Sequence, residues 1–309
     1  MAAAAPALLA TSVPELVELG EEMQQIAVSI PEAIKVSRYA SPELLDIPVK
    51  RLPGTNADPK LLMYRDGQEA FDVGSMRFTI IGPTREELDL LRQGWNNFLR
   101  DIDNRKQINN LRAEIRRKVD AFGHETFDLR AWNGIEDFKG VTTPNIASLM
   151  FMVEEGQRRL LLTGDSQQDI ILKGLELAGF LGDGYCHVDV LKVQHHASEH
   201  NVDENFCKRV SADHYVFCGN GSHGNPELSV IQQIYDSRMG PKSKRALAPE
   251  AADKPFKFWF STTSANQMEG SQQQETFAAV EELVASLEQR SGGLLTFAFN
   301  ENASIELTM

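Results

Sequence analysis

The sequence predicts an α/β fold, in which apolar strands alternate with amphipathic helices. Two short segments, residues 160–165 and 188–198, support this prediction most strongly. Each begins as an aliphatic run that is too short and too apolar for a surface loop, which is typical of a buried strand. The first run ends on an aspartate and the second on two adjacent histidines. A helical pattern over residues 165–181 separates the two expected strands.

The amino-terminal part of the chain has helical patterns rather than strand patterns. Residues 12–29 begin with Ser12 and Glu15 in a capping-box arrangement, and their apolar side chains fall on one helical face. A shorter helix is expected to start near Ser41, and residues 50–60 are rich in turn formers. We therefore expect a helical segment over residues 1–60, followed by an α/β domain over residues 61–309.

The α/β domain is expected to begin with strands and then to carry a long helical insertion. Three short strands are expected at residues 61–64, 70–73 and 76–81. Thr84 and Glu87 form a second capping box, which indicates the start of a helix. The helical pattern continues far beyond it, so we expect a helical insertion over residues 85–120. Residues 123–143 have few periodic signals and are expected to form a loop.

The remainder of the chain alternates between strand and helix patterns, as α/β domains do. Further strands are expected at residues 148–154, 159–163, 188–193, 215–218, 256–261, 294–299 and 304–307. Helices are expected at residues 165–181, 202–210, 226–235 and 273–289. The strands at 148–154 and 159–163 are expected to form one hairpin, and the two last strands another.

Composition restricts the classes of partner. The 309 residues are 42% hydrophobic and 24% charged, which is ordinary for a soluble globular protein. The net charge of −13 disfavours a broad contact with nucleic acid, because such contacts use Lys and Arg to neutralise phosphates. Six basic residues between Arg105 and Lys118 leave a local nucleic-acid contact open. A solvated helix face is the favoured interpretation of that segment.

The cysteines and the amino terminus favour a cytoplasmic location. The three cysteines are an odd number without C-x-x-C spacing, which is typical of buried thiols in a reducing compartment. The apolar start of the chain has no basic residue before Lys35, whereas a secretory signal begins with positive charge. An apolar run of about 18 residues, as a membrane span needs, is absent from the sequence, so no membrane contact is expected.

Three side chains at two predicted strand ends suggest part of a metal site. Ligands and metals collect outside the carboxyl ends of strands in layered α/β proteins, and Asp165, His195 and His196 lie at such ends. A carboxylate and imidazoles are ligands of Zn²⁺ and similar ions. Adjacent strand-end side chains diverge, so we expect only one histidine to face a metal directly. Two alternatives stay open: Asp165 as a helix cap, and histidines bonded only to the backbone.

These two segments also resemble a known family. Leu161 to Asp165, followed by Asp189 to Ser198, is similar to the second half of the metallo-β-lactamase fold. The similarity is to the branch that includes the hydrolase domain of competence-type DNA-uptake proteins. Ala197 stands where that branch usually has glycine, and residues 212–226 resemble it as well. The resemblance covers roughly residues 70–309. It implies a metallo-β-lactamase-like αββα sandwich, of which this chain would form the carboxyl-terminal half.

One family motif is missing from the chain. The family's main metal motif, His-x-His-x-Asp-His, precedes the Thr-Gly-Asp segment and supplies most of the ligands. Here the first histidine is His124, and the sole Asp-His pair is Asp213-His214, downstream of Asp165. The resemblance therefore leaves several alternatives: a non-catalytic scaffold, an incomplete half-domain, or one part of a split enzyme whose partner supplies the missing motif.

The resemblance implies roles for individual residues. Asp165 and His196 would be metal ligands, His196 because related tRNA-processing nucleases have a ligand histidine in a His-x-Ser setting. His195 and His223 would be catalytic residues that face substrate or transfer protons, whereas His187 and His214 are expected to be structural. The expected function is metal-dependent hydrolysis, in which hydroxide held by Zn²⁺ or Mn²⁺ attacks a phosphoester or acyl carbon, and the expected partner is a small-molecule or phosphoester substrate. With so few ligands, this chain alone would hold the metal weakly or not at all.

Overall fold

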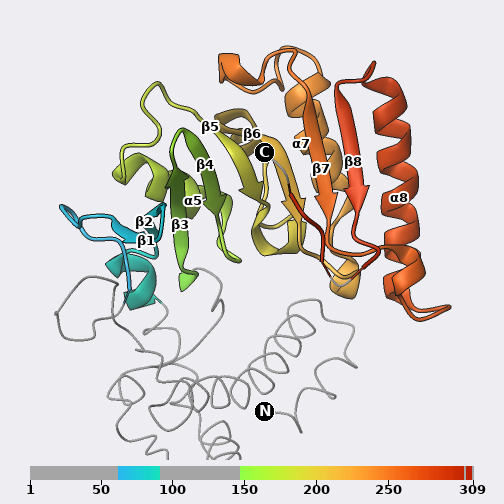
Figure 1. The fold of residues 1–309 in the computed structure, drawn as a ribbon, viewed down its shortest axis with the longest axis horizontal. Coiled ribbons are helices and arrows are strands. Elements are labelled where there is room, and N and C mark those ends of the chain that lie inside the picture. Colours follow the sequence, from blue (N-terminus) through green and yellow to red (C-terminus); the bar gives the residue numbers. More distant parts are fainter. Residues whose placement is uncertain (1–61, 91–146, 303, 308–309) are drawn as a thin grey trace, which may run out of the picture. The chain divides into compact units, whose positions relative to one another are not determined.

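The computed structural model describes residues 62–90, 147–302 and 304–307, which form a mixed α/β structure (Figure 1). The chain divides into two compact units, Met1–Leu61 with Leu88–Pro144, and Leu62–Glu87 with Asn145–Met309. Nearly all described residues belong to the second unit. The expected helical segment at 1–60, the loop at 123–143 and the insertion beyond residue 90 lie outside the described residues, as does the basic segment Arg105 to Lys118.

The described strands form an eight-stranded sheet in which strand order follows chain order. The strands are β1 (Phe71–Val73), β2 (Met76–Gly82), β3 (Met150–Glu155), β4 (Arg158–Leu162), β5 (Cys186–Lys192), β6 (Val210–Phe217), β7 (Phe256–Phe260) and β8 (Leu295–Phe299). Strands β1 to β4 pair antiparallel, and β4 to β8 pair parallel. The predicted α/β class is confirmed. The carboxyl ends of β4, β5 and β6 consequently lie side by side at one edge of the sheet.

Four helices connect the parallel strands and cover one face of the sheet. They are α5 (Gln168–Leu177), α6 (Glu204–Arg209), α7 (Leu228–Met239) and α8 (Gln272–Arg290). Each links a strand to its next neighbour in the same direction, and right-handed crossovers therefore place all four on the same face. Successive helices contact one another. None of the described helices is long and apolar enough to cross a membrane.

The core lies between this helical layer and the sheet. Alternate strand residues such as Met152, Leu161 and Phe258 are fully buried there, together with Leu175 of α5 and Val284 of α8. Burial of one stripe of each helix and alternate residues of each strand is what holds an α/β layer pair together. The core thereby fixes the strand ends that carry the candidate site.

Gly174 allows α5 to pack directly on β2, and its replacement by alanine is expected to destabilise the fold. A Cβ at this position would collide with the backbone oxygen of Ile81. Overpacking of this kind costs about 1–3 kcal/mol, which outweighs the gain of up to about 1 kcal/mol that alanine brings to a helix. Chemical denaturation should show a lower free energy of unfolding for Gly174→Ala. Gly182→Ala is the control, because nothing lies within 4 Å of its added Cβ. Equal stability of both variants would contradict this packing.

Several predicted elements are confirmed. Strands β3 and β4 form the predicted hairpin, with Glu155 opposite Arg158. The Thr84 capping box is formed as well, since the Thr84 amide donates to the Glu87 carboxylate (2.6 Å) and the Glu86 amide donates to Thr84 Oγ1 (3.2 Å). Residues 85–90 are helical after it, up to the end of the described segment.

Two predicted strands are wrong. Residues 62–64 are not a strand: the Tyr64 amide donates to the carbonyl of Pro83 (2.7 Å), and Pro83 has no N–H with which to continue a ladder. Residues 304–307 do not pair with β8 as expected; β8 pairs in parallel with β7. The Asn302 amide instead donates to the side chain of Asn300 (3.1 Å), a local bond that competes with strand pairing.

The strand predicted at 215–218 is longer than expected, because polar side chains in its first half find partners within the sheet. Strand β6 begins at Val210. His187 Nδ1 lies 2.9 Å from Ser211 Oγ, and Trp259 Nε1 donates to His214 Nδ1 (3.0 Å). Both histidines therefore contact side chains of neighbouring strands, as we expect of residues with a structural role.

Candidate metal and catalytic site

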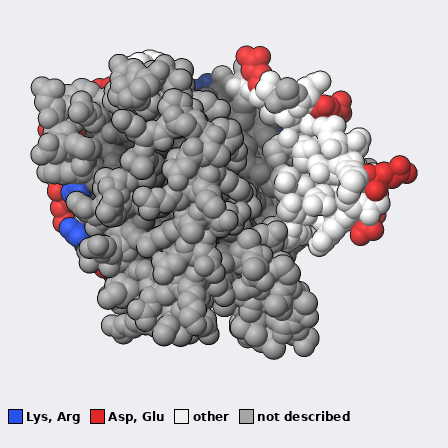
Figure 2. Space-filling model, turned by 90° about the horizontal axis from the view of Figure 1, so that it is seen from below, with Lys and Arg blue, Asp and Glu red and all other residues white. Residues whose placement is uncertain are grey.

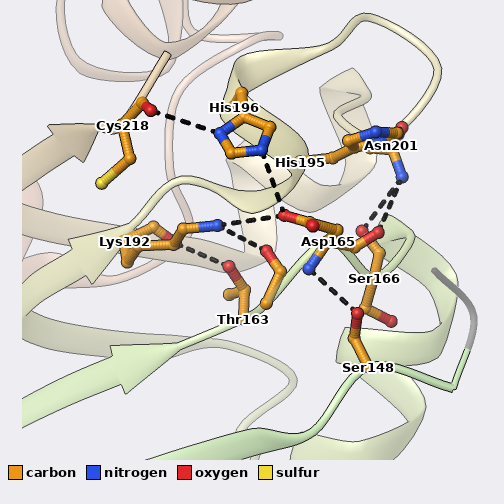
Figure 3. A network of polar contacts seen from close by, with 10 residues as sticks. Ser148, Thr163, Asp165, Ser166, Lys192, His195, His196, Asn201 and Cys218 are labelled. Carbon is orange, nitrogen blue, oxygen red and sulfur yellow. Dashed lines mark hydrogen bonds and ion pairs between the residues drawn. The ribbon is translucent and has the colours of Figure 1, made fainter. Parts of the chain in front are cut away.

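The candidate site lies where the neighbouring parallel strands β4, β5 and β6 end (Figure 3). Leu162, the last residue of β4, is in register with Lys192, the last residue of β5. Asp165 follows β4 in the loop to α5, and the two adjacent histidines follow β5 in a short 3-10 turn, Gln194–Ala197. Parallel pairing thus brings together Asp165, His195 and His196, which the sequence placed at strand ends.

Asp165 does not cap the helix that follows it. The N-cap of α5 is Gln167, which makes no side-chain capping bond. The Asp165 amide donates to Ser148 Oγ (3.1 Å), and this contact fixes the loop against the start of β3. Gly164 is required there: it has φ 57°, and an added Cβ would lie 2.8 Å from Ser148 Cβ. The helix-cap alternative is therefore wrong, and the Asp165 carboxylate remains available to the site.

The histidine turn holds three consecutive side-chain-bearing residues in left-handed conformations. His195, His196 and Ala197 have φ values of 43°, 55° and 68°. Such conformations cost on the order of 1–3 kcal/mol each and persist where surrounding contacts enforce them. Here the His195 amide donates to the Gly164 carbonyl (3.2 Å), and the Glu227 amide donates to the Ala197 carbonyl (3.1 Å). The strained turn separates the two rings, whose centroids are 6.2 Å apart with planes at 60°.

His196 is oriented as a metal ligand would be. Its Nδ1 lies 3.2 Å from the carbonyl oxygen of Cys218, just beyond β6, and a carbonyl can only accept, so Nδ1 carries the proton. Its Nε2 then faces the Asp165 carboxylate, 3.8 Å from Oδ1. Zn²⁺ bonds N and O at about 2.0–2.2 Å, so two ligands of one tetrahedral ion lie roughly 3.3 Å apart. The observed separation is close to that spacing.

A lysine shares the Asp165 carboxylate. Lys192 Nζ donates to the Gly164 carbonyl (2.6 Å) and lies 3.4 Å from Asp165 Oδ1. Its side chain is 19% exposed, whereas those of Asp165 and His196 are 39% and 46% exposed. Thr163 Oγ1 donates to the Lys192 carbonyl (2.7 Å) and ties the two strand ends together. Sequence reasoning missed Lys192, although a basic residue at the end of a buried apolar strand was the available signal.

His195 is bonded to Asn201 rather than to Asp165. Its Nδ1 lies 2.7 Å from Asn201 Oδ1, and Figure 3 shows the ring turned away from His196 toward that amide. The predicted divergence of the two histidine side chains is confirmed. Burial lowers the pKa of His195, while the hydrogen bond to Asn201 raises it less than burial lowers it. His195 is thus kept neutral near pH 7, as a proton acceptor requires.

His223 lies on the next loop along the same sheet edge. It is in the 3-10 turn Ser222–Gly224 that follows β6, with φ 57°, and this turn contacts α8. His223 is exposed and is not part of the network in Figure 3. Its catalytic role stays a prediction.

The cysteines differ in their surroundings. Cys186 and Cys207 are buried as expected, and burial raises the pKa of the Cys186 thiol to about 11. Cys218 is exposed, so the expectation of a third buried thiol is wrong. The reason is its position just beyond the end of β6, where its carbonyl, rather than its thiol, contacts the site.

Surface charge on the face seen in Figure 2 is mainly negative where the structure describes it. Asp and Glu side chains lie around an uncharged area at the right of the view, and the few Lys and Arg at the left lie beside acidic residues. The described part of this face therefore has no continuous row of basic residues of the kind that follows a phosphate backbone.

Within the described residues, no group of three or more His, Cys, Asp and Glu side chains is arranged to hold a metal ion. The two candidate ligand atoms that face each other are Asp165 Oδ1 and His196 Nε2, 3.8 Å apart. Comparison with known proteins found no matching family model, no matching curated protein and no matching solved structure.

Proposed function

We propose that this chain provides the carboxyl-terminal ligands of a metal-dependent hydrolase site, with Asp165 and His196 on the same divalent ion. One observation carries the proposal: Asp165 Oδ1 and His196 Nε2 face each other at 3.8 Å while the Cys218 carbonyl holds the opposite ring nitrogen. Ligand histidines almost always donate their second ring N–H to a carbonyl or carboxylate in this way. The described sheet and the helical layer on its one face would be one half of a metallo-β-lactamase-like αββα sandwich.

The residues present fit a shared ion but do not complete its coordination. Zinc sites use three or more protein ligands, so further ligands would come from a partner chain or from sequence joined to this one. Zn²⁺ or Mn²⁺, when bound, lowers the pKa of water and polarises a phosphoryl or acyl oxygen. The chain itself would supply the Asp165 carboxylate, the Nε2 atom of His196, and His195 as a nearby proton acceptor. A phosphoester or acyl compound of low molecular weight remains the proposed substrate.

A second candidate function is a non-catalytic scaffold, and the position of Lys192 favours it. Its ammonium group already lies 3.4 Å from Asp165 Oδ1 and 2.6 Å from the Gly164 carbonyl. The carboxylate thus has a counter-charge of its own and can remain folded without a metal. The two candidates differ in whether a divalent ion can displace this ammonium group.

The purified chain alone is expected to retain less than one equivalent of Zn²⁺ or Mn²⁺ after dialysis. Two ligands in competition with an ammonium group hold an ion weakly. Elemental analysis of the dialysed protein measures the stoichiometry. Addition of millimolar Zn²⁺ during a thermal melt should still raise the melting temperature of the wild type, but not that of Asp165→Asn. Two tightly retained ions per chain would overturn the half-site proposal, and no shift with added Zn²⁺ would favour the scaffold.

A further inference from the structure

Asn201 contacts both loops of the candidate site, namely the loop after β4 that carries Asp165 and the turn after β5 that carries the two histidines. It is 3% exposed, and its own amide donates to the Ser198 carbonyl (3.0 Å) in the turn after the two histidines. The buried Gln194 side chain donates to the Asn201 carbonyl (2.7 Å). Asn201 is therefore fixed at its backbone, and its side chain points toward Asp165, Ser166 and His195 (Figure 3).

The two ends of the Asn201 amide have different partners. Nδ2 donates to the backbone carbonyls of Ser166 (3.1 Å) and Asp165 (3.4 Å), whereas Oδ1 lies 2.7 Å from His195 Nδ1. Backbone carbonyls can only accept hydrogen bonds, so the NH₂ group must be on their side. The amide oxygen must then face His195, and an oxygen can only accept. His195 Nδ1 consequently carries the proton, and Nε2 carries the lone pair.

We infer that Asn201 is a positioning residue that locks His195 in the tautomer with Nε2 as proton acceptor and couples this ring to the Asp165 loop. The same tautomer is set independently in His196 by the Cys218 carbonyl. Both adjacent histidines thus carry a proton on Nδ1, and Nε2 of His196 lies beside the Asp165 carboxylate. The inference rests on the proposed function for its chemical meaning, but its structural content does not depend on metal binding or turnover.

The test is a nitrogen–proton NMR correlation experiment on the full chain with isotope-labelled histidines, in the absence of metal. In the wild type, His195 is expected to be protonated at Nδ1 and unprotonated at Nε2. Asn201→Ala removes the acceptor that Asn201 Oδ1 provides for Nδ1 and should shift His195 toward the Nε2–H tautomer that free imidazole prefers. His196 should keep its Nδ1 proton in that variant, because its partner is the Cys218 carbonyl.

Two further variants separate positioning from folding. Asn201→Asp keeps an acceptor for Nδ1 but loses the donor to the Asp165 and Ser166 carbonyls; it should keep the Nδ1 proton while amide exchange at Asp165 becomes faster. Asn220→Ala is the matched control, because its exposed amide only accepts from the Ser222 amide (3.1 Å), and it should leave His195 unchanged. An Nε2–H tautomer of His195 in the wild type overturns the inference, as does an unchanged His195 tautomer in folded Asn201→Ala. Absence of hydrolysis by the completed site with the wild-type chain would count against the proposed function and leave the tautomer inference intact.

Discussion

Replacement of Asp165 or His196 by alanine is expected to abolish hydrolysis by the completed site. A segment that bears His-x-His-x-Asp-His, fused to the chain or co-expressed with it, should yield phosphodiesterase or esterase activity with Mn²⁺ or Zn²⁺. Each alanine variant then removes one ligand of the shared ion, and we expect kcat to fall at least about a thousandfold, or about 4 kcal/mol of transition-state stabilisation. Initial rates on simple chromogenic phosphodiesters and esters measure this effect.

His214→Ala is the control for folding in the same assay. Its ring accepts from Trp259 Nε1 (3.0 Å) within the sheet and lies outside the ligand network. We therefore expect its activity to stay within a few-fold of the parent, on the order of the modest losses that peripheral changes cause. If all three variants lose activity equally, the losses at Asp165 and His196 reflect folding rather than chemistry.

Replacement of Lys192 by methionine is expected to tighten divalent metal binding by about tenfold or more. The ammonium group lies 3.4 Å from Asp165 Oδ1 and opposes any cation at that oxygen. Two unit charges about 4 Å apart interact by about 4 kcal/mol at an effective dielectric constant of 20, and solvent at this half-exposed carboxylate reduces that figure. A tenfold change corresponds to about 1.4 kcal/mol, well within this range. Calorimetric titration with Zn²⁺ measures the affinity.

Lys173→Met is the matched control for the loss of a lysine. Its ammonium group pairs with Glu87 (2.9 Å) and Glu86 (2.6 Å) at the start of the helix after β2, and it has no contact with Asp165. This variant should bind Zn²⁺ as the wild type does. Unchanged or weaker Zn²⁺ binding in Lys192→Met would show that Lys192 does not compete with the metal.

Buried strands were predictable because their composition is unambiguous. The aliphatic runs before Thr163 and before Gln194 lie in the centre of the sheet, and residues such as Leu161 and Leu191 are buried against the helical layer. The segments 62–64 and 304–307 were harder to predict, since single hydrogen bonds to Pro83 and Asn300 replace strand pairing there. The polar first half of β6 looked unlike a strand because its partners, among them His187 and Trp259, are distant in sequence.

The candidate site was predictable in its residues but not in its geometry. Parallel strands end at one edge, so Asp165 and the histidine pair were expected to lie together. The left-handed turn at His195 to Ala197 had no sequence signal, because left-handed positions usually carry glycine or asparagine. The partners that set each ring, Cys218 and Asn201, depend on how β6 and the loop after β5 pack in three dimensions. The proposed competition of Lys192 with a metal depends on its distance from Asp165, which follows from the folded structure and not from the sequence pattern.

A double-mutant cycle of metal binding tests the central claim most directly. Co²⁺ titration, followed by its absorption, would be carried out on the wild type, Asp165→Ala, His196→Ala and the double variant. If both side chains hold one ion, each single change should weaken binding at least about tenfold, or about 1.4 kcal/mol. The loss in the double variant should then be clearly smaller than the sum of the two single losses. Losses that add, or a single variant that binds Co²⁺ as tightly as the wild type, would show that Asp165 and His196 do not share an ion.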